Sequence, residues 1–208
     1  HASMFARLQR MARGERRKLL YVAVQRDGKQ TAANLPKIDL AADRSQLLDA
    51  VLNAGFGALI RQRPYDVVAN PDVTPKAIFV SAFDTAPLAP DYNFVLKGRA
   101  ADVQTGLSVL AKLTDGKVYY SVSPSTSAEL RNMHDVEITE FAGAHPAGNV
   151  GVQVNHLSPV NKGEVVWTVD PSAVIFFGRL FVDGKVNLVR RVAVAGSEMI
   201  DTCYVDVL

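Results

Sequence analysis

The chain has 208 residues, of which 48% are hydrophobic and 21% charged, so it can bury one sizeable core and does not resemble a disordered protein. Its formal net charge is only +2, and outside the first twenty positions the charge is close to neutral, so we expect no nucleic-acid partner. The single cysteine, Cys203, excludes a disulfide within the chain and an iron–sulfur cluster held by its own thiolates.

The start of the chain is basic, and six basic residues fall within the first twenty positions: Arg7, Arg10, Arg13, Arg16, Arg17 and Lys18. We interpret residues 1–4 as an expression scar and the basic run as a solvated arm. Residues 19–24 are β-branched or aromatic, which predicts a strand, but no pairing partner is expected upstream. Residues before Pro36 should therefore pack loosely. No apolar run approaches the roughly 20 residues that cross a bilayer, which predicts no direct membrane span.

Strand and helix patterns alternate through the middle of the chain, as they do in βαβ units. Asp43 should cap a helix that runs to about Asn53 and ends at Gly55. The sequence then predicts a buried strand at 77–82, a helix at 101–113, a strand at 118–122, a short helix opened by a capping box of Thr126 and Glu129, a strand at 136–141 and a helix after Asn149.

The last part of the chain begins with a strong helix start. Asp170 and Pro171 combine a capping carboxylate with a proline whose missing N–H is harmless in the first turn, and the helix should run to about Val182. Residues 186–195 alternate as a half-buried strand would. We predict an α/β fold of three layers with a mostly parallel sheet, formed by strands at 77–82, 118–122, 136–141 and 186–195.

Catalytic and metal-binding motifs are missing from the sequence. It has no Gly-x-Ser-x-Gly motif, and the histidines beyond the first residue, His134, His145 and His156, show no metal-ligand spacing. We therefore expect no catalytic residue and no metal ligand in this chain.

Two glycine-containing loops are the remaining candidates for binding. Gly55 and Gly57 lack the third glycine of a dinucleotide fingerprint and follow a helix, which favours a helix C-cap. The loop 143–149 follows a strand and opens a helix, an arrangement that suits an anion or the edge of a cofactor. A plain structural turn is the alternative for the second loop.

Several stretches in register resemble one family. They are IRQRPY at 60–65, AIFVSAFDTAPL at 77–88, FAGAHPAGN at 141–149, VWTV at 166–169 and RRVAVAG at 190–196. Together they resemble the A subunit of the sodium-translocating NADH:quinone oxidoreductase, and they cover most of the chain.

The resemblance implies a Rossmann-like αβα domain at 36–196, distantly similar to the flavin subunit of complex I and to the C subunit of Rnf complexes. Those relatives bind flavin through a glycine-rich loop, which here is the degenerate segment marked by Asn53, Gly55, Gly57 and Arg61. Leu59 and Ile60 are bulky there, and the relatives' acidic motif is altered at 81–87. We therefore expect the chain to bind no cofactor.

The resemblance also implies a role in a larger assembly. Residues 5–35 would carry the last strand of a truncated N-terminal barrel-sandwich domain, and 197–208 would begin the next segment. The expected function is that of a peripheral subunit on the cytoplasmic face of the bacterial inner membrane. Other subunits would carry the flavins and the iron centre and handle NADH, and quinone is a candidate contact. A flavin- or NADH-binding module and a free-standing interaction domain are the alternatives.

The best candidate contact is the loop 143–149, which strand 136–141 should deliver to the carboxyl edge of the sheet. His145 could donate a hydrogen bond to a quinone carbonyl or to a partner's carboxylate, and Pro146 would stiffen the turn. Gly148 leaves room for a close approach, and Asn149 precedes the helix. The alternative is that His145 only caps neighbouring backbone.

Overall fold

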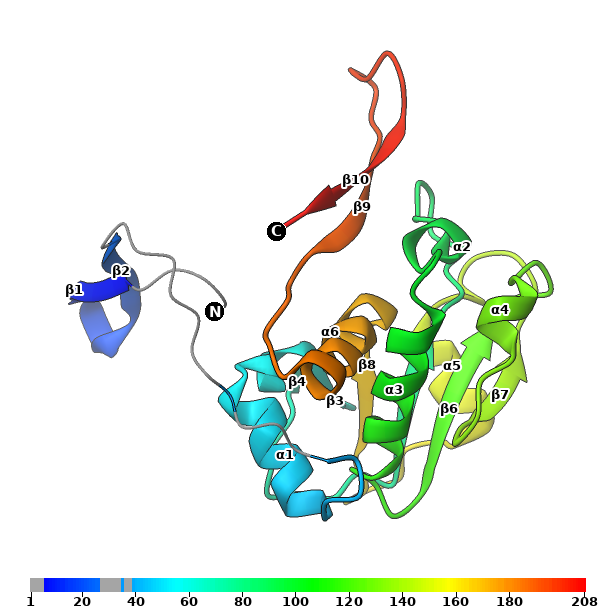
Figure 1. The fold of residues 1–208 in the computed structure, drawn as a ribbon, viewed down its shortest axis with the longest axis horizontal. Helices are drawn as coiled ribbons and strands as arrows, with labels where there is room; N and C mark the ends of the chain where they lie inside the picture. Colours follow the sequence, from blue (N-terminus) through cyan, green and yellow to red (C-terminus); the bar gives the residue numbers. More distant parts are fainter. Residues whose placement is uncertain (1–5, 27–34, 36–38) are drawn as a thin grey trace.

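The structure is a computed structural model that describes residues 6–26, 35 and 39–208. Its elements are shown in Figure 1: β1 Ala6–Arg13, η1 Glu15–Arg17, β2 Leu19–Arg26, α1 Arg44–Asn53, η2 Phe56–Leu59, β3 Ile60–Arg63, β4 Val67–Val68, β5 Ala77–Ser81, α2 Tyr92–Val95, α3 Ala100–Ala111, β6 Lys117–Val122, α4 Ala128–Arg131, β7 Glu137–Glu140, α5 Val150–Leu157, β8 Val166–Val169, α6 Pro171–Asp183, β9 Arg190–Val194 and β10 Cys203–Val207. No helix in the described part of the chain combines the length and apolar character that a membrane span requires.

A six-stranded sheet forms the centre of the fold, in the order β4-β3-β8-β5-β6-β7. The four strands β8, β5, β6 and β7 are parallel to one another. Strand β3 runs antiparallel to β8, and β4 runs antiparallel to β3. The predicted α/β class is confirmed. The sheet is mixed, because β3 runs opposite to the four parallel strands.

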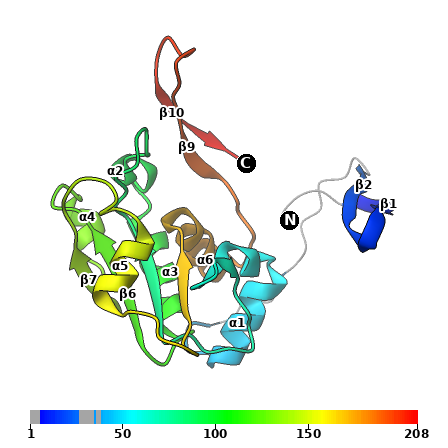
Figure 2. The same ribbon diagram turned by 180° about the vertical axis from the view of Figure 1, so that it is seen from behind.

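Helices cover both faces of the sheet. In Figures 1 and 2, α1, α3 and α6 lie on one face and α5 lies on the other. Alternate residues of the strands follow this division: Ile78, Val80 and Trp167 belong to the larger core beneath α3 and α6, whereas Phe79 and Val166 pack with Val154 of α5. The period of two along each strand thus divides the core into two unequal layers.

The predicted strand at 186–195 does not join the central sheet, and that prediction was wrong. The strand observed there, β9, pairs antiparallel with β10 in a separate two-stranded sheet. The position in the central sheet belongs to β8, whose four residues are all buried. A four-residue run that leads directly into a helix cap carries too little pattern to identify a strand, whereas the longer run at 186–195 fits a half-exposed hairpin equally well.

The N-terminal strand is not alone, contrary to expectation. Strand β2 pairs antiparallel with β1, so the basic arm is itself a strand. Arginines permit this because a hairpin exposed on both faces does not have to bury their side chains. Leu20 and Tyr21 of β2 are 60% and 50% exposed, but the reason given for loose packing before Pro36, a strand without a pairing partner, does not hold. Pro36 itself lies outside the described residues.

Helix starts followed the sequence at both predicted aspartate caps, and Asn149, which was expected only to precede a helix, caps one as well. Asp43 and Gln46 form a reciprocal capping box at α1, Asn149 accepts from the Gly151 N–H at α5, and Asp170 accepts from the Ser172 N–H at α6. The box predicted at Thr126 was wrong. Its hydroxyl instead accepts from the Ser123 N–H at 2.9 Å, and α4 begins after Ser127 without a side-chain cap. The hydroxyl of a threonine in a tight turn can accept from a backbone N–H of that turn, and it then no longer caps a helix N-terminus.

Helices α3 and α6 cross in close contact through two glycines. A Cβ at Gly106 would lie 2.1 Å from the Val174 carbonyl oxygen, and one at Gly178 would lie 1.9 Å from the Asp102 carbonyl oxygen. Both obstacles are backbone atoms, which cannot turn aside as a side chain would. The absence of a side chain at these positions therefore sets the distance between the two helices.

We predict that Gly178→Ala destabilises the fold by about 1–3 kcal/mol, the usual cost of overpacking a core. Alanine favours a helix over glycine by up to about 1 kcal/mol, but the clash with backbone outweighs this gain. Thermal unfolding followed by circular dichroism should show a midpoint several degrees lower.

Gly151→Ala in α5 is the matched control. A Cβ there meets only the Asn149 side chain, at an ordinary distance of 3.7 Å. This variant should be neutral or slightly stabilising. Equal midpoints for the two variants would show that the α3–α6 crossing is not limited by Gly178.

Candidate functional site

The strand order changes direction at the boundary between β5 and β8. From β5 the chain passes through α3 to β6 on one side, and from β7 it returns through α5 to β8 on the other side of β5. The segments that leave β5 and β8 therefore diverge at the carboxyl edge of the sheet. Open α/β sheets place their ligands in the crevice at such a point.

A cleft of about 450 Å³ lies at this edge. It is lined by Leu59, Arg61, Arg63, Asp66, Ser81, Phe83, Asp84, Ala86, Tyr92, His145, Gly148, Asn149, Val150, Thr168, Val169, Asp170 and Pro171. The residues come from the ends of β5 and β8, from the loop before α5 and from β3. The lining combines apolar walls with a few charged and hydroxyl groups, which is the usual character of a small-molecule site.

The cleft brings together residues from both loops that the sequence suggested. His145, Gly148 and Asn149 line it from one side and Arg61 from the other. Arg61 reaches this edge because β3 is antiparallel to β8, so that Ile60 pairs with Val169 at the carboxyl end of β8. Of the other predicted site residues, Pro146, Asn53, Gly55 and Gly57 do not appear in the lining of this cleft.

The loop after β5 and the loop before α5 are joined by one hydroxyl group. Thr85 Oγ1 accepts from the Gly148 N–H at 3.0 Å and lies 3.3 Å from His145 Nδ1. His145 itself is exposed, so its second ring nitrogen is open to a ligand. The expected alternative was that His145 caps neighbouring backbone, but the partner found for its ring is the Thr85 side chain.

Gly148 is buried, and its close approach is to this chain's own backbone. A Cβ at this position would lie 2.4 Å from the Thr85 nitrogen and 2.7 Å from Asp84 Cα. The sequence suggested that glycine leaves room here for a contact. The structure shows that the room is taken by the loop after β5, which is how the two loops close one wall of the cleft.

Two arginines of β3 share one carboxylate in the β3–β4 turn. Arg61 Nε and Arg63 Nε lie 3.5 and 3.6 Å from Asp66 Oδ1, and Arg61 also donates to the Asp66 carbonyl. The Arg61 and Asp66 side chains are 44% and 50% exposed, so the pairs contribute little stability. Arg61 lines the cleft while it makes these contacts with Asp66.

Tyr92 and Asp170 form a second polar pair in the lining. The Tyr92 hydroxyl donates to Asp170 Oδ2 at 3.2 Å. Burial, the Asp170 carboxylate and the more distant Asp84 carboxylate raise the pKa of the Tyr92 phenol well above its ordinary value. The phenol is thus a hydrogen-bond donor throughout the physiological pH range.

Sequence reasoning missed Tyr92, Thr85 and Asp170 as site residues. Asp170 was identified only as a helix cap, and Thr85 only as part of an altered motif. The pairing of Tyr92 with Asp170 follows from β8 lying beside β5, which was not foreseen. Tyr92 belongs to a four-residue helix, and no periodic signal marks so short an element.

At the helix N-termini beside the cleft, side chains of this chain cap backbone N–H groups. At α6, the Asp170 carboxylate accepts the Ser172 N–H, and Pro171 has no N–H to offer. At α5, the Asn149 side chain accepts the Gly151 N–H. These amides are the groups that would otherwise bind a phosphate.

The segment that the sequence suggested as a degenerate flavin loop is also filled. Gly55 adopts a left-handed conformation at the end of α1, as a helix C-cap should, and buried Phe56 begins η2. A Cβ at Gly57 would meet the Leu52 side chain at 2.7 Å. The glycines thus serve helix termination and local packing.

His134 and His156 lie outside the cleft. The His134 backbone N–H donates to Gln104 Oε1, and His156 Nδ1 lies 2.9 Å from the Val152 carbonyl oxygen within α5. Within the ranges that the structure describes, no three metal-ligating side chains gather in one place.

We predict that Thr85→Val accelerates hydrogen exchange of the Gly148 amide by roughly fivefold, because the lost hydrogen bond contributes about 1 kcal/mol. The measurement is amide exchange followed by NMR. Thr105→Val is the control, since the Thr105 hydroxyl donates to Ala101 within α3. An unchanged Gly148 exchange rate would mean that Thr85 does not hold the two loops together.

The sequence also matches known proteins. Residues 42–186, from α1 to just beyond α6, match the family described as the NqrA second alpha/beta domain. The chain is 38% identical to the Na(+)-translocating NADH-quinone reductase A subunit of Saccharophagus degradans over 192 residues, which are 91% of this chain and 43% of the relative. For the A subunit of a Marinomonas species, the identity is 36% over 90% of this chain and 42% of the relative.

The same protein of Neisseria gonorrhoeae is 33% identical over 90% of this chain and 42% of its own length. The chain therefore spans less than half the length of these curated relatives. Because the family match covers well over half of the 208 residues and follows the central sheet, the chain belongs to the family of Na(+)-translocating NADH-quinone reductase A subunits and contains their second α/β domain.

Proposed function

We propose that this chain is the α/β part of a peripheral subunit of a Na⁺-translocating NADH:quinone reductase, and that its cleft contacts quinone. The curated relatives carry the name of the A subunit of such an enzyme. The observation that carries the quinone contact is the convergence of His145, Arg61 and Tyr92 in one cleft at the strand-order reversal. The proposed complex as a whole would oxidise NADH and export sodium. This subunit would lie on the cytoplasmic face of the bacterial inner membrane.

The cleft suits a neutral, planar ligand with carbonyl oxygens. Its polar donors are the His145 ring and the Arg61 guanidinium, which accompany the apolar side chains of Leu59, Phe83 and Val169. A quinone carbonyl accepts hydrogen bonds, and its ring packs against apolar walls. The proposed role of this chain is to hold the quinone, while flavins and an iron centre on other subunits transfer the electrons.

The second candidate is a flavin- or NADH-binding module in a Rossmann-like domain. The α/β fold and the switch point favour it. The self-capped starts of α5 and α6 argue against it, because a dinucleotide phosphate would have to displace Asn149 or Asp170. At α6 a phosphate would also face the negative charge of Asp170. The quinone contact is therefore the better-supported proposal.

We predict that His145→Ala, introduced into the full-length subunit, raises the KM for quinone roughly 3–10-fold, as expected for the loss of one hydrogen bond. The complex should still assemble, because the His145 side chain is exposed. Assembly would be checked by size-exclusion chromatography, and turnover by steady-state kinetics with NADH and quinone.

His156→Ala serves as the matched control, since His156 bonds within its own helix. Gly148→Val tests the wall of the cleft, because its side chain must displace the loop at Thr85. If the His145 and Gly148 variants both assemble and turn over like the parent enzyme, the cleft does not take quinone.

A further prediction separates the two candidates. The purified 208-residue chain should retain no flavin absorption band after dialysis. It should also give no saturable heat of NADH binding in the micromolar range by calorimetry. The physical reason is that Leu59, Asp170 and Asn149 occupy the space and the amides that a phosphate needs. Tight binding of either cofactor would reverse the ranking of the two candidates.

A further inference from the structure

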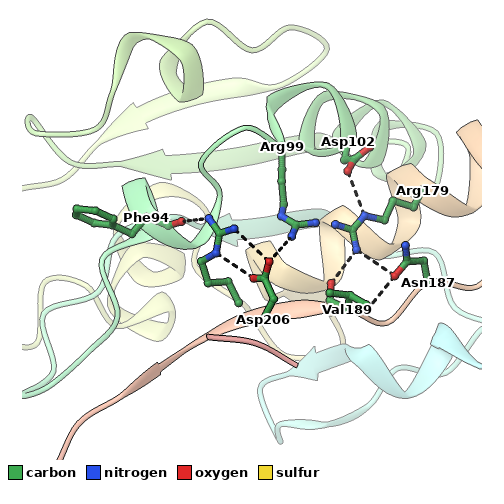
Figure 3. Close-up of polar contacts among 8 residues, drawn as sticks. Phe94, Arg99, Asp102, Arg179, Asn187, Val189 and Asp206 are labelled. Atoms are coloured by element: carbon green, nitrogen blue, oxygen red, sulfur yellow. Dashed lines mark hydrogen bonds and ion pairs between the residues drawn. The ribbon is translucent and has the colours of Figure 1, made fainter. Parts of the chain in front are cut away.

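The hairpin β9–β10 extends from the α/β core, and residues 190–207 lie beyond the range 42–186 that matches the family domain (Figure 1). Asp206 of β10 fastens the hairpin to the core. Its carboxylate accepts from Arg191 Nε at 3.0 Å and lies 3.5 Å from Arg99 Nη2, at the start of α3. Figure 3 shows Asp206 between the two guanidinium groups. The side chains of Arg99 and Arg191 are 17% and 27% exposed, so these pairs are partly shielded from water.

The same hairpin holds the short segment that contains α2. The Tyr204 ring stacks on Phe94, with centroids 5.5 Å apart and an interplanar angle of 13°. Its hydroxyl accepts from the Asp91 N–H at 2.8 Å, and Arg191 donates to the Phe94 carbonyl at 3.1 Å. Tyr204 and Arg191, about a hundred positions away in the sequence, thus make three contacts with the four-residue segment 91–94.

The segment that the hairpin holds also carries Tyr92 into the cleft. Tyr92 directly follows Asp91, and its hydroxyl donates to Asp170. The pair Tyr92 and Asp170 separates the cleft from a second hollow of about 310 Å³, whose other side is formed by β9. The hairpin therefore lies on one side of this pair and the cleft on the other.

The two ends of α2 are anchored differently. Its later residues, Val95 and Leu96, are buried in the core, and Asn93 bonds to Ser125 and Ser127 of the neighbouring loop. The hairpin contacts Asp91, ahead of Tyr92, and Phe94, whose side chain is 51% exposed. Tyr92 also packs against the core, so loss of the hairpin contacts should loosen the Tyr92 segment and its bond to Asp170 without unfolding the core.

We propose that Tyr204 and Asp206 are positioning residues for the cleft: by holding the segment 91–94, the hairpin keeps the Tyr92 hydroxyl on Asp170. A movement of the hairpin would then change the wall of the cleft without any contact between hairpin and ligand. The proposal concerns the free protein, and its test requires neither quinone nor the other subunits.

The test follows the Tyr92 ring in the whole chain. The six tyrosines would be replaced by 3-fluorotyrosine, and the Tyr92 line in the ¹⁹F NMR spectrum assigned by its loss in Tyr92→Phe. In Asp206→Asn, in Tyr204→Phe and most strongly in the double variant Tyr204→Ala, Asp206→Ala, the Tyr92 line should move toward its position in the unfolded chain. Its phenol should also ionise at lower pH than in the parent, because it loses part of the burial, and with it the contact with Asp170, that keep its pKa raised.

Two comparisons separate positioning from a general loss of stability. Asp201→Asn changes an exposed carboxylate in the connection between β9 and β10 and should leave the Tyr92 line in place. Asp206→Glu keeps the charge and should restore most of the parent spectrum. A merely structural role would lower the unfolding temperature without moving the Tyr92 line. If the line and the ionisation of Tyr92 stay unchanged in the double alanine variant, the proposal is wrong.

Discussion

The short strand β8 must satisfy its backbone on both sides, and the arrangement of the cleft depends on how it does so. It bonds in parallel to β5 and antiparallel to β3, and its four residues are buried. Buried N–H and C=O groups without partners would cost several kcal/mol, so the strand cannot shift or detach. Its carboxyl end is thereby fixed between the end of β5 and the start of β3. Residues from these strands can form one cleft only because of this pairing.

The electrostatics of the cleft distinguish it from a phosphate site on the same kind of fold. Its helix starts are capped by Asn149 and Asp170, and its two β3 arginines share Asp66. The lining contains two arginines and three aspartates, so it has no excess of positive charge for a phosphate, and its donors lie beside apolar walls. Membership of a family establishes the fold, whereas the ligand has to be argued from these groups.

The cleft is also connected to parts of the chain outside the matched domain. Tyr92 lies in the cleft, while its neighbours Asp91 and Phe94 contact the hairpin through Tyr204 and Arg191. Such an arrangement can transmit a displacement, because tightly packed and hydrogen-bonded segments move together. In a protein whose relatives are more than twice as long as this chain, such a link would let another region act on the site.

Local signals in the sequence determined the helix caps at Asp43 and Asp170, the helix start after Asn149, the alternation of strands and helices, and the turn before α5, because each depends on residues within one or two turns of chain. The tertiary structure alone decided which runs pair in the central sheet. It placed β8 there, paired β9 with β10, and set Gly148 against Thr85 across 63 positions of sequence. These outcomes depend on competition among distant partners for backbone hydrogen bonds and buried surface, and no window of neighbouring residues contains that information.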